Sequence, residues 1–240
     1  IALILRLFRR IPYTVMTHAM DITVPMNPQS PNRKQFLLRL ILRHATSITT
    51  VSRYTKDKII SCGIPSDRVH VIHPCPHING TESPETLTHT TNQQPISSDK
   101  KILLSVGRLI ERKGFDTVIR TLRRIQEAVP QTHYIIVGEG PYKKTLQSIA
   151  ERLGIQRSVT FVGQCTDQEL RAWYQRCDVF IMPSRELENS DTEGFGIVYV
   201  EASSFGKPVI GSTVGGISDA VVDGQTGFIV DPEDSTMVAD

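Results

Sequence analysis

This sequence has few cysteines and almost no net charge. The four cysteines stand far apart, with no C-x-x-C pair, and they are Cys62, Cys75, Cys165 and Cys177. This spacing predicts neither a zinc site nor a dense disulfide framework, so we expect reduced thiols and a cytoplasmic protein. With 27 Lys and Arg against 25 Asp and Glu, the net charge is +2. A charge so near zero predicts no nucleic-acid partner, and any basic site must be local.

Long hydrophobic runs are missing too. Residues 1–5 are apolar, but Arg6, Arg9 and Arg10 end that run far short of the roughly 20 residues that span a bilayer. The segment also lacks the cleavage site of a signal peptide. We expect residues 1–11 to form an amphipathic helix packed in its domain; peripheral contact with the cytoplasmic face of a membrane is the alternative. Because the first residue is Ile rather than Met, we expect an excerpt of a longer protein.

What the sequence does contain is a regular alternation of apolar strands and amphipathic helices. The predicted strands are 13–17, 47–51, 69–72, 102–106, 133–137, 159–162, 178–182 and 208–210, and the predicted helices are 36–44, 53–62, 115–128, 141–153, 167–175 and 195–205. This alternation indicates α/β structure, a parallel sheet with helices on both faces. We also expect Pro25, Pro28 and Pro31 to lie in a loop and Asp167 to cap a helix.

The length and one polar stretch predict two domains. At roughly 150 residues per domain, 240 residues allow one large or two modest domains. Residues 79–99 are dominated by Thr, Ser, Pro, Asn and Gln, which is typical of a linker. We therefore predict a first domain over residues 1–78, a linker over 79–100 and a second domain over 101–240.

The carboxyl ends of the predicted strands are the places to look for a ligand, because loops meet helix N-termini there. Arg108 and Lys113 lie on one loop between a strand and a helix. Two such cations could clamp a diphosphate, with Arg as a forked donor and Lys as a point charge. A solvated surface loop is the alternative interpretation. Gly138 and Gly140 form G-x-G before a helix, but Lys143 replaces the third glycine, so we expect no NAD site.

The segment from Glu193 to Glu201 carries the most distinctive pattern. Its two acids are eight positions apart, which places Glu193 in a loop and Glu201 about two turns into a helix. Gly194 and Gly196 let the backbone approach a ligand closely, and a helix N-terminus offers free N–H groups to phosphate. A solvated or salt-bridged Glu201 is the alternative.

These segments resemble, in their order, the retaining GT-B glycosyltransferases, and specifically glycosyltransferase family four, the "group 1" transferases. The resemblance is strong over residues 101–234 and moderate over 13–77. The E-x7-E segment EGFGIVYVEA is its most specific part. The other parts are Gly107-Arg108, Lys113-Gly114, VGEGP at 137–141, FVG at 161–163, and KPVI at 207–210 followed by Gly215, Gly216 and Gly227.

The resemblance implies a GT-B fold of two Rossmann-like domains facing each other across a cleft. It implies that the first domain lacks its opening strand and glycine-rich loop, and that the second lacks its closing helices. It also implies that a nucleoside-diphosphate sugar, held mainly by the second domain, is the co-substrate. The sugar would pass with retention to a hydroxyl acceptor, without a metal or cofactor.

The resemblance also implies a role for each site residue. Arg108 and Lys113 would hold the diphosphate, Glu201 the ribose and Glu193 the donor sugar. The donor-binding backbone would include Gly138, Gly163, Cys165, Phe195, Gly196 and Ile197, with Gly163 and Cys165 near the base. His18 would reach the sugar from the first domain, and a purely structural histidine is the alternative.

Three functions remain open at this stage. The leading one is a hexosyltransferase of glycan biosynthesis, whose acceptor is a glycan, a glycolipid or a small molecule. A lipid-linked acceptor would agree with membrane contact by residues 1–11. The alternatives are a nucleotide-sugar-binding module without turnover and a GT-B sugar epimerase. The sequence does not fix the base, the sugar or the acceptor.

Overall fold

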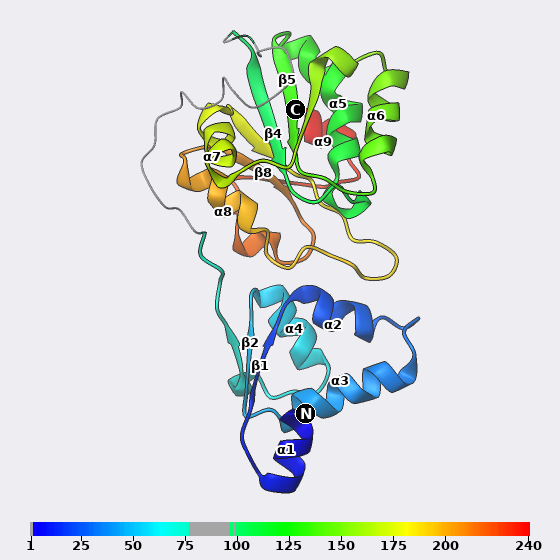
Figure 1. The fold of residues 1–240 in the computed structure, drawn as a ribbon, viewed down its shortest axis with the longest axis vertical. Helices are drawn as coiled ribbons and strands as arrows, with labels where there is room; N and C mark the ends of the chain where they lie inside the picture. The colour runs from blue at the N-terminus through cyan, green and yellow to red at the C-terminus, as the bar shows by residue number, and fades with distance from the viewer. Residues whose placement is uncertain (1, 77–96, 98) are drawn as a thin grey trace. The chain divides into compact units, whose positions relative to one another are not determined.

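The computed structural model describes residues 2–76, 97 and 99–240, and this part of the chain forms two compact units (Figure 1). The first unit comprises Ile1–Cys75, Glu186–Gly196 and Val214–Ala220. The second comprises Pro76–Arg185, Ile197–Thr213 and Val221–Asp240. Most of the predicted linker lies outside the described residues, and the predicted domain boundaries stay predictions. None of the described helices combines the length and the apolar character needed to cross a bilayer.

The described part of the first unit is built on a three-stranded parallel sheet in the order β1-β2-β3. Its elements are β1 (Thr14–Thr17), β2 (Ser47–Thr50) and β3 (Val69–Val71), with α1 (Ala2–Arg9), α2 (Ala19–Met26), α3 (Asn32–His44) and α4 (Arg53–Ser61). The core joins apolar side chains of the helices, such as Ile22, Leu42 and Ile59, to Ile48 of β2. The three predicted strands and two predicted helices of this region are therefore confirmed.

Helix α2 corrects the predicted loop at Pro25, whereas Pro28 and Pro31 lie outside the helices as predicted. Pro25 lies in its last turn, and Pro31 is the N-cap of α3. Ile22 is fully buried in the core, so tertiary packing holds a short helix that propensity alone disfavours. Its first turn is closed by the His18 N–H, which donates to the Asp21 carboxylate at 2.8 Å.

Among its described residues the second unit holds a six-stranded, all-parallel sheet in the order β6-β5-β4-β7-β8-β9. The strands are β4 (Lys101–Val106), β5 (Thr132–Val137), β6 (Val159–Gly163), β7 (Val179–Ile181), β8 (Val209–Ser212) and β9 (Gly227–Val230). The helices are α5 (Phe115–Ala128), α6 (Lys143–Arg152), α7 (Asp167–Arg176), α8 (Ile197–Ser204) and α9 (Ser235–Ala239). The predicted strands and helices of this region are all present, and β9 and α9 were not predicted.

The strand order places a switch point in the middle of this sheet. The chain builds outward from β4 to β5 and β6, then returns to pair β7 with β4 and continues to β8 and β9. In doubly wound sheets, ligands bind beyond the carboxyl ends of the strands where the order reverses. The ends of β4 and β7, and the loops that follow them, are therefore the positions to examine.

Candidate functional site

The carboxyl ends of β4, β5 and β6 meet through glycines. The Gly107 N–H donates to the Val137 carbonyl at 3.0 Å, and the Gly138 N–H donates to the Gly163 carbonyl at 2.8 Å. A Cβ on Gly138 would clash with the Gly107 carbonyl oxygen. Gly107, Gly138 and Gly163, which we call the glycine edge, all have positive φ angles, from +83° to +156°, a region that side chains disfavour. Backbone without side chains thus faces the region beyond these strands.

The structure brings Lys113 to the glycine edge. A Cβ on Gly107 would lie 3.7 Å from the Lys113 Cε and 3.9 Å from its Nζ, so the ammonium group lies over the end of β4. Arg108 is the next residue after Gly107 and its side chain is exposed. Helix α5 begins directly after Gly114, which is in the left-handed conformation. Cations, free helix N–H groups and glycine backbone therefore occur together, as an anion site requires.

Arg185 and Asp116 stabilise this loop, and sequence reasoning missed both. The Arg185 guanidinium donates to the buried Asp116 carboxylate at 2.5 Å and to the Thr117 hydroxyl at 3.0 Å. The Arg185 N–H donates to the Arg112 carbonyl at 2.8 Å. These bonds fasten the segment after β7 to the first turn of α5. No sequence signal joins residues that are 69 positions apart.

The G-x-G segment after β5 has a structural role. Tyr142 donates its N–H to the Leu109 carbonyl at 3.0 Å, and a Cβ on Gly140 would clash with that same carbonyl. The turn is thus packed against the loop that carries Arg108 and Lys113. Because its backbone is used in this way, α6 begins at Lys143 and not at Pro141 as predicted. The segment is therefore a tight turn that leads into α6.

The loop between β6 and α7 contains Cys165, a partly buried thiol. Burial, with smaller contributions from Glu169 and Asp167, raises the pKa of Cys165 to about 11, so the thiol is neutral at pH 7. Helix α7 is capped by Thr166, whose hydroxyl accepts from the Glu169 N–H at 3.3 Å while Glu169 accepts the Thr166 N–H at 2.7 Å. The prediction that Asp167 is the cap was wrong, because Thr166 and Glu169 form a reciprocal capping box.

Glu201 lies in α8 and has a partner that the sequence did not indicate. Gly196 has a φ of +84° and the helix begins after it, at Ile197, two residues later than predicted. Glu201 is consequently a little over one turn into the helix. Its Oε2 accepts from the Tyr174 hydroxyl at 2.7 Å. Burial and the nearby carboxylate raise the pKa of Tyr174, so this hydroxyl stays protonated and orients Glu201.

Glu193 and His18 both belong to the first unit. Glu193 is 9% exposed, and its carbonyl accepts from the Gly216 N–H at 2.9 Å. A Cβ on the next residue, Gly194, would lie 3.3 Å from the Cβ of Ala19, which follows His18. The structure thus brings the neighbours of two predicted residues together from distant parts of the chain. The exposed His18 ring is accessible to a ligand, while its N-cap position agrees with the structural alternative.

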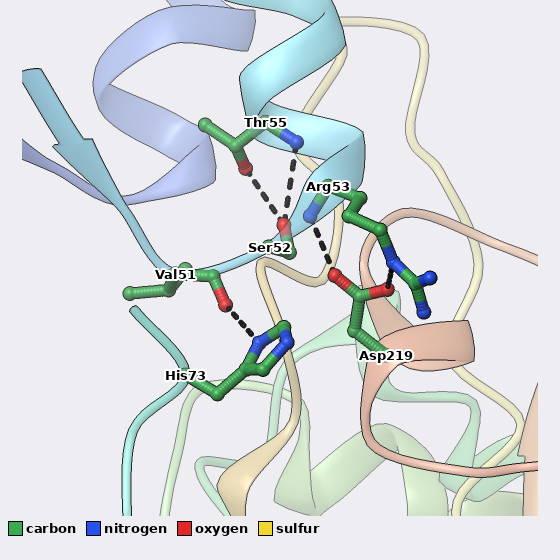
Figure 2. A network of polar contacts seen from close by, with 6 residues as sticks. All are labelled: Val51, Ser52, Arg53, Thr55, His73 and Asp219. Carbon is green, nitrogen blue, oxygen red and sulfur yellow. Dashed lines mark hydrogen bonds and ion pairs between the residues drawn. The ribbon is translucent and has the colours of Figure 1, made fainter. Parts of the chain in front are cut away.

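Phe195 contacts a histidine that sequence reasoning did not single out. The ring of Phe195 is stacked on His73 with 5.3 Å between ring centroids. The His73 Nδ1 lies 3.1 Å from the Val51 carbonyl oxygen (Figure 2). Phe195 and Gly196 are thus held in the first unit, whereas Arg108, Lys113 and Glu201 belong to the second. The predicted convergence of all these residues on one ligand stays a prediction.

Two family matches now give this arrangement a context. Residues 88–240 match the family described as "Glycosyl transferases group 1". Residues 1–76 match the family described as "Glycosyltransferase Family 4". The chain belongs to the glycosyl transferases group 1 family. The assignment made from the sequence, to glycosyltransferases and to family four, is confirmed.

Individual proteins support the same assignment. A GDP-mannose-dependent alpha-(1-6)-phosphatidylinositol monomannoside mannosyltransferase of Mycolicibacterium smegmatis is 35% identical over 219 residues, covering 91% of this chain and 56% of that protein. A D-inositol 3-phosphate glycosyltransferase of Corynebacterium aurimucosum is 29% identical and covers 87% and 50%. The crystal structure of Anabaena Alr3699/HepE in complex with UDP-glucose has 26% identity and a TM-score of 0.77, covering 99% and 63%. The chain spans about half the length of these curated relatives, and the predicted GT-B fold class is confirmed.

Proposed function

We propose that this protein is a retaining glycosyltransferase that moves a hexosyl group from a nucleoside-diphosphate sugar to a hydroxyl acceptor. The observation that carries the proposal is the position of the Lys113 ammonium over the glycine edge, beside Arg108 and the first turn of α5. A diphosphate at this point would meet positive charge and free backbone N–H groups together. Glu201, oriented by Tyr174, would accept hydrogen bonds from the ribose.

In the proposed reaction the bond between the anomeric carbon and the diphosphate oxygen breaks, and the electron pair leaves with the nucleoside diphosphate. Arg108 and Lys113 stabilise the negative charge that develops on the leaving group. The acceptor oxygen bonds to the anomeric carbon on the face that the leaving group vacates, and its proton passes to the departing phosphate. Glu193 and His18 contact the sugar hydroxyls. Since the two cations neutralise the diphosphate, no metal is required.

The relatives favour a particular donor and acceptor class. Two kinds of donor occur in their names, GDP-mannose for the mycobacterial enzyme and UDP-glucose for the Anabaena structure. We propose GDP-mannose as the donor because it belongs to the relative with 35% identity. That relative acts on a phosphatidylinositol mannoside, so we propose a lipid-linked polyol as the acceptor.

A membrane-facing surface on the first unit would suit such an acceptor. Helices α1 and α3 contact each other and expose Phe8 and Phe36, which are 81% and 67% accessible. Arg9 and Arg33 are exposed on the same two helices. Aromatic and basic side chains together favour the interface of an anionic bilayer. We propose that the protein acts in the cytoplasm, at the inner face of the membrane.

The membrane proposal predicts that acidic residues at positions 33 and 36 weaken lipid binding. Phe36→Asp combined with Arg33→Glu should lower co-sedimentation with phosphatidylglycerol vesicles by about tenfold, because each basic residue near the surface contributes about 1 kcal/mol. Neutral phosphatidylcholine vesicles serve as the lipid control. Arg157→Glu, which reverses an exposed charge in the second unit, serves as the protein control. Unchanged binding of the double variant would remove this surface from the proposal.

A donor panel tests the proposed function directly. GDP-mannose, UDP-glucose and ADP-glucose are each added to the full-length protein, and the thermal midpoint of unfolding is measured. We expect GDP-mannose to raise the midpoint, because a ligand that binds only the folded state stabilises it. No shift with any nucleotide sugar would overturn the proposal. Donor binding without transfer to any acceptor would instead favour a binding module, and free sugar or epimer formed from donor alone would favour an epimerase.

The role of Glu201 gives a second prediction for binding. Glu201→Ala should weaken nucleoside diphosphate binding by about 1 to 3 kcal/mol, because it removes a charged hydrogen-bond acceptor. Tyr174→Phe should have a smaller effect in the same direction, because it removes only the bond that orients the carboxylate. Calorimetry measures both. A 2′,3′-dideoxy nucleotide, which lacks the ribose hydroxyls, should bind the wild type and Glu201→Ala equally well, and a persisting difference would refute the ribose contact.

A further inference from the structure

A buried carboxylate in the first unit, that of Asp219, accepts a backbone N–H at the start of α4, a helix from a distant part of the sequence. The Asp219 side chain is 2% exposed. It accepts hydrogen bonds from the backbone N–H of Arg53 at 2.5 Å and from the Arg53 Nε at 2.6 Å (Figure 2). Arg53 is the first residue of α4, where the free N–H groups and the helix dipole favour a negative charge. The Arg53 side chain is 72% exposed, so the backbone N–H is the more constrained of the two donors.

Asp219 is joined by one turn to the glycines that contact Glu193. The Asp219 N–H donates to the Gly216 carbonyl at 3.1 Å, which closes the 3-10 turn η5 (Ile217–Asp219) around the fully buried Ile217. The Gly216 N–H in turn donates to the Glu193 carbonyl at 2.9 Å. A Cβ on Gly215 would clash with the same carbonyl. A short series of backbone contacts therefore leads from Asp219 to the backbone of Glu193.

The N-cap of α4 completes the contact from the opposite direction. Ser52 is fully buried, and its hydroxyl accepts from the Thr55 N–H at 3.3 Å. A Cβ on Gly216 would lie 2.6 Å from the Ser52 Oγ and would clash with the Gly194 carbonyl. The start of α4, the Gly216 backbone and the residue after Glu193 are thus packed without space for a side chain. A shift of η5 away from α4 would move the Glu193 backbone with it.

We propose that Asp219 is a positioning residue for the sugar half of the donor site. By fixing η5 to the N-terminus of α4, it holds the backbone of Glu193 in the position from which the carboxylate contacts the donor sugar. This inference rests on the proposed function of Glu193. Its specific consequence is that loss of Asp219 weakens recognition of the sugar and leaves recognition of the nucleoside diphosphate nearly unchanged, because Arg108, Lys113 and Glu201 belong to the other unit.

The experiment compares two ligands in the full-length protein. Calorimetry gives the affinity for the nucleotide sugar that the wild type binds more tightly, GDP-mannose or UDP-glucose, and for its nucleoside diphosphate. Asp219→Ala should weaken nucleotide-sugar binding about tenfold, consistent with the loss of a hydrogen bond to a charged group, and nucleoside diphosphate binding less than about twofold. Asp219→Asn keeps an oxygen that can accept the Arg53 N–H, so it should restore much of the affinity for the sugar.

Two further measurements distinguish a positioning role of Asp219 from a general loss of stability: a double-mutant cycle with Glu193, and a control substitution of Asp178, a carboxylate with similar contacts. In a Glu193→Ala background, Asp219→Ala should change sugar binding by less than about twofold, because the two residues act through one contact. Asp178→Ala is the control: Asp178 also accepts one backbone N–H, from Ile102 at 2.8 Å, and one side-chain cation, Lys101 at 3.0 Å. It should lower thermal stability without changing the ratio of the two affinities.

The possible outcomes distinguish this inference from the proposed function. If the wild type binds neither nucleotide sugar, the proposed function and the positioning role both fail. If the wild type binds but Asp219→Ala weakens both ligands equally, only the positioning role is overturned. Full additivity with Glu193→Ala would overturn it as well. Selective loss of sugar binding, rescued in part by Asp219→Asn, would support it.

Discussion

Lys113→Ala is expected to lower the rate of sugar transfer by about 100- to 1000-fold, the usual cost of removing one preorganised donor of charge stabilisation. The ammonium lies over Gly107 at the end of β4, where the proposed leaving group gains negative charge. Because this charge is greatest in the transition state, kcat should fall more than the affinity for the donor. Steady-state kinetics with donor and acceptor both varied would measure the two effects separately.

The opposite end of the same strand supplies the control for Lys113. Lys101 begins β4 and pairs with Asp178 at 3.0 Å, so Lys101→Ala removes an equal charge far from the carboxyl end of the strand. We expect this control to leave kcat within about twofold, as for a surface pair of small energetic value. Arg108→Ala should act in the same direction as Lys113→Ala. Equal loss of affinity for a nucleoside and for its diphosphate in Lys113→Ala would contradict the diphosphate role.

The elements that could be predicted from the sequence are those whose signal is local. Strands such as β5 are buried throughout, and a strand buried on both faces appears as a continuous apolar run bounded by turn residues. The starts of α6 and α8 differ from the predicted ones, because a helix start depends on backbone geometry. The apolar pattern predicts that the helix starts at Phe195. Gly196 has a positive φ, which is not helical, so α8 begins after it. Helix α2 was missed because Pro25 indicates a loop locally, while burial of Ile22 stabilises a helix.

The supporting contacts of the site could not be predicted in the same way. Glu201 was identified from its motif, but the hydroxyl that orients it comes from Tyr174, on another helix. Pairings of this kind depend on which helices cover the same face of the sheet. A single sequence does not contain that information, because many carboxylate and hydroxyl pairs would satisfy composition and spacing equally well. The motif therefore shows the groups that would contact a ligand, and the fold shows what holds them.

Gly138→Ala is expected to destabilise the second unit by more than about 2 kcal/mol, because strain at a positive φ is combined with a steric clash. Gly138 has a φ of +132°, and an added Cβ would collide with the Gly107 carbonyl oxygen. Gly107 is held in place, because its N–H donates a hydrogen bond to the Val137 carbonyl. Relief of the clash requires the ends of β4 and β5 to separate, which would displace Lys113 from the glycine edge. Nucleotide-sugar binding should therefore be lost with the stability.

Gly224→Ala separates the clash from the strain. Gly224 also has a positive φ, of +70°, but a Cβ there would have nothing within 4 Å. Its replacement should cost only the backbone strain, about 1 kcal/mol, and should leave nucleotide binding unchanged. Urea unfolding measures the free energy of both variants, and calorimetry with the donor measures binding. If Gly138→Ala lowered the free energy of unfolding no more than Gly224→Ala does, the close approach of the ends of β4 and β5 would be contradicted. If it lost stability but kept full donor affinity, the glycine edge would be structural and the diphosphate would have to bind elsewhere.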